Sequence, residues 1–101
     1  MRESKADRLN WVYILTNIHR SVFYTGSTAD IVGRMREHEN GEVAFTAKYN
    51  CTLLVWFEEA GNMDDALARE HRVKRWKRDY KVALIEAKNP EWNDLRHLLA
   101  A

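Results

Sequence analysis

The chain has 101 residues, of which 46% are hydrophobic and 31% charged, and its formal net charge is +1. No apolar run approaches the ~20 residues of a membrane helix, the first eleven residues lack the apolar segment of a secretion signal, and the lone Cys51 excludes an internal disulfide. We therefore expect one globular domain over residues 1–101, located in the cytoplasm and without a membrane partner.

Two strands and a helix are predicted in the first part of the chain. Trp11–Thr16 is rich in β-forming residues and predicts a strand, and Val22–Thr25 predicts a second strand that stops at Gly26. The short connection between them indicates a hairpin. Asp30 is the expected cap of a helix that runs from Ile31 to about Glu39.

The second part of the chain continues after a polar loop that is expected to reach about Asn50. Three further elements are predicted, a strand that we expect to be central and two helices: Thr52–Glu58, Met63–Trp76 and Asp79–Ala87. Asn62 is the expected cap of the first of these helices, and Asn89-Pro90 ends the second. Residues 91–101 form either a short helix or a tail.

The order β-β-α-β-α-α predicts an α/β (α+β) fold. In this arrangement a small, three-stranded, mostly antiparallel sheet is flanked by helices, which cover its apolar faces.

Polar residues interrupt the apolar faces of two predicted helices. Arg34 and His38 share a face with Ile31 and Met35, and Glu70 lies within the apolar stripe of the later helix. An unpaired buried charge costs several kcal/mol, so these positions need an explanation. One interpretation is a structural Arg34–Glu70 ion pair with His38 hydrogen-bonded nearby. The other is a cleft where an arginine, a histidine and a carboxylate meet for phosphate chemistry.

Two tyrosines lie on the predicted hairpin that precedes the helix of Arg34. Tyr13 shares a strand face with Trp11 and Leu15, and Tyr24 shares one with Gly26. A strand tyrosine taken alone is usually half-buried packing with a hydrated hydroxyl. Two of them next to an arginine and a histidine favour a functional site.

Basic residues are concentrated in one part of the sequence. Seven of the sixteen Lys and Arg residues fall between positions 69 and 81: Arg69, Arg72, Lys74, Arg75, Lys77, Arg78 and Lys81. Such a run gives a nearly neutral protein one basic face, which suits a nucleic-acid backbone. A solvated helix face is the alternative interpretation.

Together these motifs resemble the GIY-YIG nuclease superfamily over about Trp11 to Leu95. The resemblance is to its short stand-alone bacterial members and to the N-terminal nuclease domain of the excision-repair endonuclease subunit. It rests on these segments: Val12-Tyr13-Ile14, Tyr24-Thr25-Gly26, Asp30–Arg34, His38–Gly41, Phe45–Tyr49, Ala68-Arg69-Glu70 and Asn89–Trp92. Trp11 and Thr25 depart from the signature at strand positions, where such changes are mild.

The resemblance implies an endonuclease that hydrolyses DNA phosphodiesters with one divalent ion, Mg²⁺ or Mn²⁺. Glu70 would bind the metal and Arg34 would stabilise charge on the phosphate. Either Tyr13 or Tyr24 would position or activate water, with His38 as its aid, and Asn89 would be a supporting hydrogen-bonding residue. The expected substrate contacts are Gly26, Lys48, Arg69, Lys74, Arg75, Lys77 and Arg78.

Several alternatives stay open at this point. DNA is the expected partner, but the sequence does not separate it from RNA. A homodimer could cut both strands of a duplex, and a targeting protein could bring the small domain to its substrate. The rival to the enzyme is a non-catalytic nucleic-acid-binding module on the same scaffold.

Overall fold

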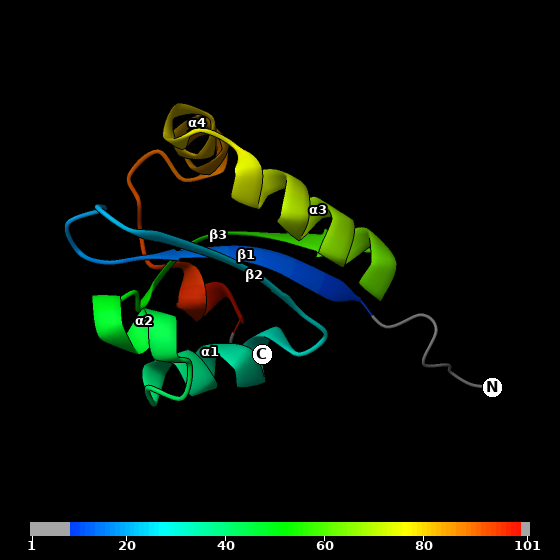
Figure 1. Cartoon of the computed structure of the whole chain (residues 1–101), viewed down its shortest axis with the longest axis horizontal. Coiled ribbons are helices and arrows are strands. Elements are labelled where there is room, and N and C mark those ends of the chain that lie inside the picture. Colours follow the sequence, from blue (N-terminus) through cyan, green and yellow to red (C-terminus); the bar gives the residue numbers. More distant parts are fainter. Residues whose placement is uncertain (1–8, 100–101) are drawn as a thin grey trace.

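The computed structural model describes residues 9–99. Strands, α-helices and one 3₁₀-helix follow in the order β-β-α-α-β-α-α-η (Figure 1): β1 Asn10–Thr16, β2 Phe23–Thr28, α1 Ile31–Glu39, α2 Ala44–Tyr49, β3 Leu53–Ala60, α3 Met63–Arg75, α4 Arg78–Lys88 and η2 Leu95–Leu99. The predicted α+β fold is confirmed, with one helix more than expected. Within the described range no helix is long and apolar enough to cross a bilayer.

The sheet is antiparallel throughout, with strand order β2-β1-β3. Tyr13 of β1 pairs with Gly26 on one side and Phe57 on the other. The prediction that the 52–58 strand is central was wrong, because β1 holds that place. β3 is apolar although it lies at an edge, since its Val55 packs toward α4 while its Leu54 lies in the cluster that includes η2 residues.

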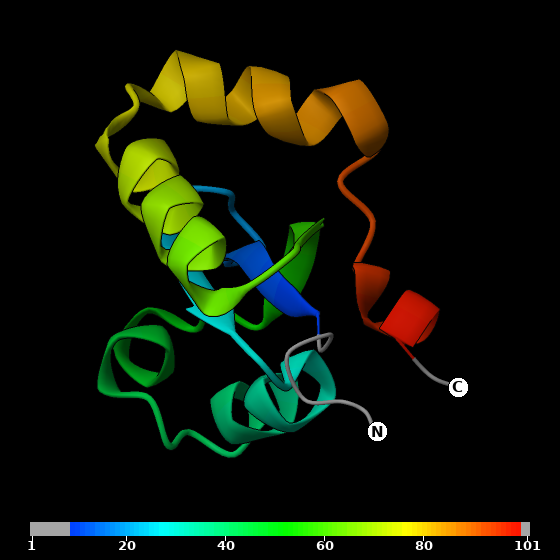
Figure 2. The ribbon, with the colours of Figure 1, turned by 90° about the vertical axis from the view of Figure 1, so that its right-hand side faces the viewer.

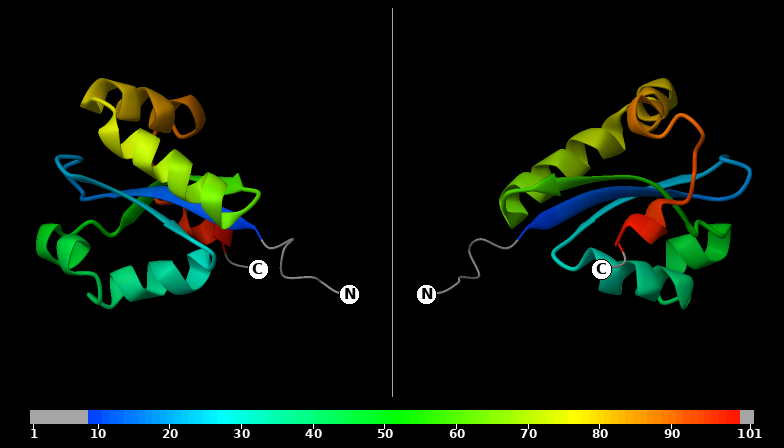
Figure 3. Two further views of the ribbon diagram at one scale, coloured as in Figure 1. Left: turned by 45° about the vertical axis from the view of Figure 1, so that its right-hand side comes forward. Right: turned by 180° about the vertical axis from the view of Figure 1, so that it is seen from behind.

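Helices cover both faces of the sheet. α3 and α4 lie on one face, and α1, α2 and η2 lie on the other (Figures 1 and 3). Val12 and Ile14 are buried in the cluster under α3 and α4, whereas Tyr13 and Leu15 are buried in the cluster against α1. The predicted alternation along β1 is therefore confirmed. Because α1 and α3 lie on opposite faces, their polar side chains meet only at the edge of the sheet.

Both predicted helix caps are present. The Asp30 carboxylate accepts a hydrogen bond of 3.0 Å from the Gly33 backbone N–H, and the Asn62 side chain accepts one of 2.8 Å from Asp65. These bonds satisfy backbone donors that a helix start leaves free. The cap at Asp30 fixes where α1 begins and therefore which face carries Arg34.

Two predicted boundaries were wrong. β2 does not stop at Gly26 but continues to Thr28, because an extended glycine leaves room for the Tyr13 ring that crosses it. The expected polar loop before Asn50 contains α2, which is only six residues long. So short a helix shows too few turns for its periodicity to be seen.

The chain returns across the edge of the sheet after α4. α4 crosses the end of α3 and leads through the 89–94 segment to η2 (Figure 2). The expected helix or tail at 91–101 is a 3₁₀-helix over Leu95–Leu99, and residues 100–101 lie outside the described range. Asp94 ties this segment to β3 by accepting a hydrogen bond of 3.4 Å from the Leu54 backbone N–H.

Candidate active site

Tyr13 is the buried centre of a polar network between β1 and α1. Its side chain has no exposed surface, yet its hydroxyl lies 3.4 Å from Arg34 Nε and 2.9 Å from His38 Nε2. Arg34 donates to the phenol oxygen because a guanidinium has no acceptor. The phenol therefore joins the arginine and the histidine that the sequence places on one face of α1.

The hydrogen bonds of His38 define its tautomer. Thr46 of α2 donates its hydroxyl proton to the Val43 carbonyl at 3.2 Å, so its oxygen accepts from His38 Nδ1–H at 2.8 Å. His38 Nε2 is then unprotonated and accepts the O–H of Tyr13. A continuous, consistently directed chain of hydrogen bonds runs from Tyr13 through His38 to the start of α2.

Burial keeps both members of this chain neutral. Burial raises the pKa of Tyr13 to about 12, although the hydrogen bond from Arg34 opposes the shift. Burial, with the Arg34 charge added, lowers the pKa of His38 from 6.5 to about 4. Near neutral pH the pair is therefore a phenol donating to an imidazole, and Arg34 carries the local positive charge.

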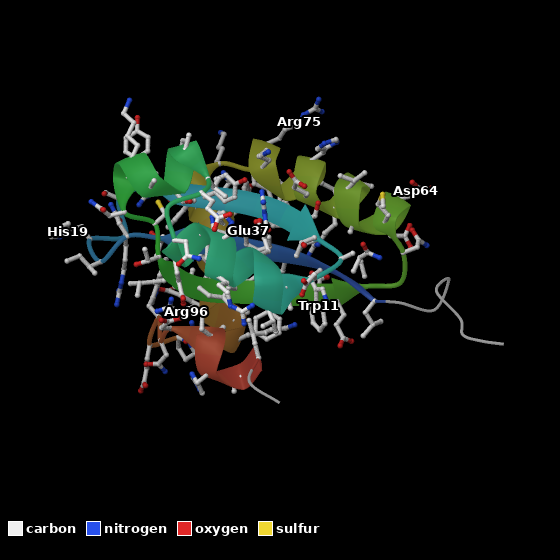
Figure 4. All side chains as sticks on the ribbon, turned by 90° about the horizontal axis from the view of Figure 1, so that it is seen from below. Trp11, His19, Glu37, Asp64, Arg75 and Arg96 are labelled. Atoms are coloured by element: carbon white, nitrogen blue, oxygen red, sulfur yellow. The ribbon has the colours of Figure 1, made fainter. Side chains whose placement is uncertain are left out.

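Arg34 is held from several sides and still reaches solvent. Its Nη1 pairs with Glu37 at 2.7 Å, and its side chain is 33% exposed. The hydrogen bond to Tyr13 is the largest cause of its raised pKa, and Glu37 and the Tyr24 hydroxyl contribute. Glu37 extends from α1 toward β2 (Figure 4). A guanidinium fixed in this way presents its remaining donors to an incoming anion.

The structural Arg34–Glu70 ion pair does not form. Arg34 pairs with Glu37 instead. The Glu70 carboxylate accepts a hydrogen bond of 2.5 Å from the Ser27 hydroxyl and forms an ion pair of 3.0 Å with Lys74. A simple reason is that α1 and α3 lie on opposite faces of the sheet.

Glu70 reaches the same edge of the sheet from the α3 face. Its side chain is 12% exposed, and its partner Ser27 directly follows Gly26 in β2. The Glu70 charge contributes to the raised pKa of Tyr13, so the carboxylate lies within electrostatic range of the phenol. The edge of β2 therefore brings together groups from both layers.

Gly26 is the point where these groups converge. A Cβ atom there would lie 2.5 Å from the Tyr13 hydroxyl oxygen and 3.1 Å from Tyr24 Cε2. Both distances are below van der Waals contact, so a larger residue would displace the tyrosines. The absence of a side chain lets the two rings approach the backbone.

The two tyrosines differ in their access to solvent. Tyr13 is fully buried, whereas Tyr24 is half-buried and lies with its ring centroid 5.3 Å from that of His38. The ring centroids of the two tyrosines are 6.2 Å apart. Tyr24 is thus the phenol of the pair that a water molecule or a substrate can reach.

Sequence comparison identifies the family of the chain. The sequence profile of the GIY-YIG catalytic domain matches residues 9–82. The chain belongs to the GIY-YIG catalytic-domain family. The match includes both tyrosines, the arginine helix and Glu70, and it ends within α4.

Relatives of this GIY-YIG chain include UPF0213 proteins. The one from Haloquadratum walsbyi is 40% identical over 78 residues, which cover 76% of this chain and 86% of that protein. The one from Clostridium perfringens is 37% identical over 82 residues, covering 80% and 87%. A solution NMR structure of the UPF0213 protein from Bacillus halodurans has a TM-score of 0.56 at 26% identity, covering 92% of this chain and 99% of that one.

Asn89 and Arg69, both predicted for the candidate site, make their contacts in other parts of the structure. The buried Asn89 amide donates to the carbonyls of Val55 and Asn93 at 3.0 and 2.9 Å, which holds the turn after α4 against β3. Arg69 pairs with Glu58 at 3.0 Å, and its guanidinium lies over the Trp76 ring. The structure brings neither residue into the Tyr13 network.

The other predicted substrate contacts are spread over α2, α3 and α4. Lys74 pairs with Glu70, and Arg78 donates to the carbonyl oxygens of Arg20 and Ser21 on the β1–β2 hairpin. Arg75 and Lys77 are exposed, and Arg75 points away from α3 into solvent (Figure 4). Lys48 lies on α2 with its Nζ 5.2 Å from the centroid of the Tyr49 ring.

Sequence reasoning missed three residues that orient the side chains of the candidate site. Glu37 fixes Arg34, Thr46 fixes the His38 ring, and Ser27 holds the Glu70 carboxylate. Helical spacing from Arg34 would have pointed to Glu37. Ser27 lies 43 positions from Glu70, so nothing local in the sequence connects them.

Proposed function

We propose that this GIY-YIG chain is a metal-dependent endonuclease that hydrolyses phosphodiester bonds in DNA. The observation that carries the proposal is the convergence of Arg34, Glu70 and the accessible Tyr24 around Gly26 at the edge of β2. A cation, a carboxylate and a phenol beside one another are the groups needed to bind a phosphodiester and direct water at its phosphorus.

Arg34 stabilises charge on the phosphate oxygens. It is preorganised by Tyr13 and Glu37, so little reorganisation is needed when substrate arrives. Donors fixed where charge develops are often worth about 3 kcal/mol of barrier lowering.

Tyr24 positions the attacking water, and Tyr13 acts behind it. Tyr13 is buried and neutral and holds Arg34 and His38, which makes it a positioning residue. Tyr24 is half-buried next to the same imidazole and guanidinium. Tyr24, the tyrosine that solvent reaches, therefore contacts the attacking water, and Tyr13 positions the groups around it.

Glu70 would hold one Mg²⁺ or Mn²⁺. Its carboxylate is fixed by Ser27 at the edge of the sheet, and no group of three or more His, Cys, Asp or Glu side chains gathers among residues 9–99. One carboxylate suits magnesium, which keeps several water ligands and takes phosphate oxygens for the rest, and does not suit a closed zinc site. When bound, the ion supplies Lewis-acid stabilisation of the leaving oxygen.

Exposed basic residues of α3 and α4 position the substrate backbone. Arg75, Lys77 and Arg78 are exposed around the junction of α3 and α4, and the half-buried Lys81 follows on α4. Burial together with the charges of Arg78 and Lys74 lowers the pKa of Lys81, which marks a local concentration of positive charge. Contacts of this kind provide affinity without sequence preference.

A non-catalytic nucleic-acid-binding module is the second candidate. The observation in its favour is the Lys74–Glu70 ion pair, since a carboxylate already neutralised by a lysine has less need of a metal. Glu70 is 12% exposed but Lys74 is 53% exposed, so solvent screens the ammonium side of this pair and weakens it. The Glu70 carboxylate would therefore stay available to hold a divalent ion.

Cleavage of labelled DNAs and RNAs in Mg²⁺, Mn²⁺ or chelator tests the enzyme against the binding module. Arg34→Lys keeps the charge but loses the planar fork, and Arg36→Lys is the matched exposed control on α1. The endonuclease predicts metal-dependent cutting that falls about a hundredfold or more in Arg34→Lys and is unchanged in Arg36→Lys. If wild type and both variants bind nucleic acid but none of them cuts it, the result would favour the binding module.

A further inference from the structure

We propose that α2 presents an aromatic stacking surface for an unpaired base of a nucleic-acid strand, so that the substrate is single-stranded or locally unpaired. This inference rests on the proposed function, because it names the class of substrate for the same site. It is carried by a row of rings that begins at Tyr24 and continues outward over Phe45 and Tyr49.

The row is continuous from the site to the surface. The ring centroid of Phe45 lies 5.6 Å from that of Tyr24, and the centroid of Tyr49 lies 4.8 Å from that of Phe45. Phe45 and Tyr49 are one helical turn apart on α2, so both point to the same side. A strand whose phosphate meets Arg34 would therefore have its neighbouring base near these rings.

The rings are held in place but not covered. Phe45 is 42% exposed and Tyr49 is 38% exposed. Each ring packs against a neighbouring ring within the row, which limits its rotation and lowers the entropy lost when a base stacks on it. Aromatic surface that is fixed and still open to solvent is what base stacking requires.

A positive charge accompanies the row. The Lys48 Nζ lies 5.2 Å from the centroid of the Tyr49 ring, between the two aromatic positions in sequence. A lysine beside stacking rings can meet the phosphate of the nucleotide whose base is stacked. In a duplex the faces of internal bases are covered by their neighbours, so the rings can engage only bases that are unstacked.

Binding measured in chelator, where no metal-dependent cleavage takes place, tests this inference. Fluorescence anisotropy would compare an intact single-stranded oligodeoxynucleotide with an abasic strand that has the same phosphates. Phe45→Leu and Tyr49→Leu keep apolar volume but remove the rings, and their thermal melting checks that they are folded. Lys48→Ala is the matched control on the same helix, because it removes a charge and no ring.

The expected results separate stacking from charge. Wild type should bind the intact strand more tightly than the abasic strand by on the order of tenfold, and each Leu variant should reduce that difference. Lys48→Ala should lower the affinity for both strands by the same factor. The inference would be overturned if wild type bound intact and abasic strands equally, or if it bound neither strand. It would also be overturned if the Leu variants bound both strands like wild type.

The outcome is independent of cleavage. Equal binding of the two strands together with metal-dependent cutting of duplex DNA would reject the stacking surface and leave the endonuclease standing. If wild type prefers intact strands, the Leu variants lose that preference and no DNA is cut, the stacking surface would stand and the endonuclease would be rejected.

Discussion

At the scale of single residues, the two signature tyrosines have different surroundings and should have different mutational effects. Tyr13→Phe removes a buried hydroxyl and leaves His38 Nε2 without its donor, which should cost about 1–3 kcal/mol of stability. Tyr24→Phe should change stability by less than about 0.5 kcal/mol yet lower cleavage about a hundredfold or more. Denaturant unfolding and single-turnover rates check both. Full activity in Tyr24→Phe would remove Tyr24 from the water contact.

His38 makes stability depend on pH in a definite direction. Its folded pKa of about 4 lies below the ordinary value of 6.5, so the unfolded chain takes up the proton first. Its contribution is complete above about pH 6.5 and is lost as the pH falls toward about 4, at up to about 1.4 kcal/mol per pH unit. Melting temperatures across this window should fall more steeply for wild type than for His38→Gln. Parallel curves would show that His38 is not held neutral.

Gly26 gives a direct test of how closely the tyrosines approach the backbone. In Gly26→Ala the new methyl group would meet the Tyr13 hydroxyl, which is fixed by Arg34 and His38 and cannot move without breaking those bonds. We expect a loss of about 1–3 kcal/mol in stability together with reduced cleavage. Thr25→Ala serves as the neighbouring control for changes in strand propensity. A stable, active Gly26→Ala protein would contradict the convergence at this glycine.

At the scale of elements, the basic residues near the junction of α3 and α4 should act through charge alone. Arg75→Ala combined with Lys77→Ala removes two exposed cations, which should weaken nucleic-acid binding and reduce the slope of log affinity against log salt by about two. Lys88→Ala, also exposed on α4, is the control. Binding isotherms at several salt concentrations provide the slope. An unchanged slope would exclude this surface from the binding site.

The elements also show where sequence reasoning succeeds. The hairpin, α1 and α3 carry caps or strong residue patterns, and Asp30 and Asn62 start their helices as expected. α2 was missed because its six residues are too few to show a helical period, although its Thr46 orients His38. β2 was cut short because glycine commonly breaks strands, whereas here Gly26 makes room for Tyr13.

At the scale of the whole molecule, the site is assembled across the sheet, and this explains what the sequence leaves undecided. Arg34 and Glu70 interrupt apolar faces, so both are visible as anomalies, but whether they pair with each other or within their own helices depends on which layer each helix joins. Glu37 and Lys74 are their partners, and the suspected direct pair is absent. The late Asn89 lies at the opposite edge of the sheet, where its amide is used by backbone groups near β3. Motif order alone does not reveal that separation.

The most direct test of the central claim is the Mg²⁺ dependence of DNA cleavage by Glu70→Gln beside wild type. Glu59→Gln, an exposed carboxylate on β3, is the matched control. If Glu70 holds the ion at the edge of β2, Glu70→Gln should lose cutting at every Mg²⁺ concentration while keeping DNA binding and near-normal melting, and Glu59→Gln should cut like wild type. Metal-dependent cutting that persists in Glu70→Gln would contradict the account.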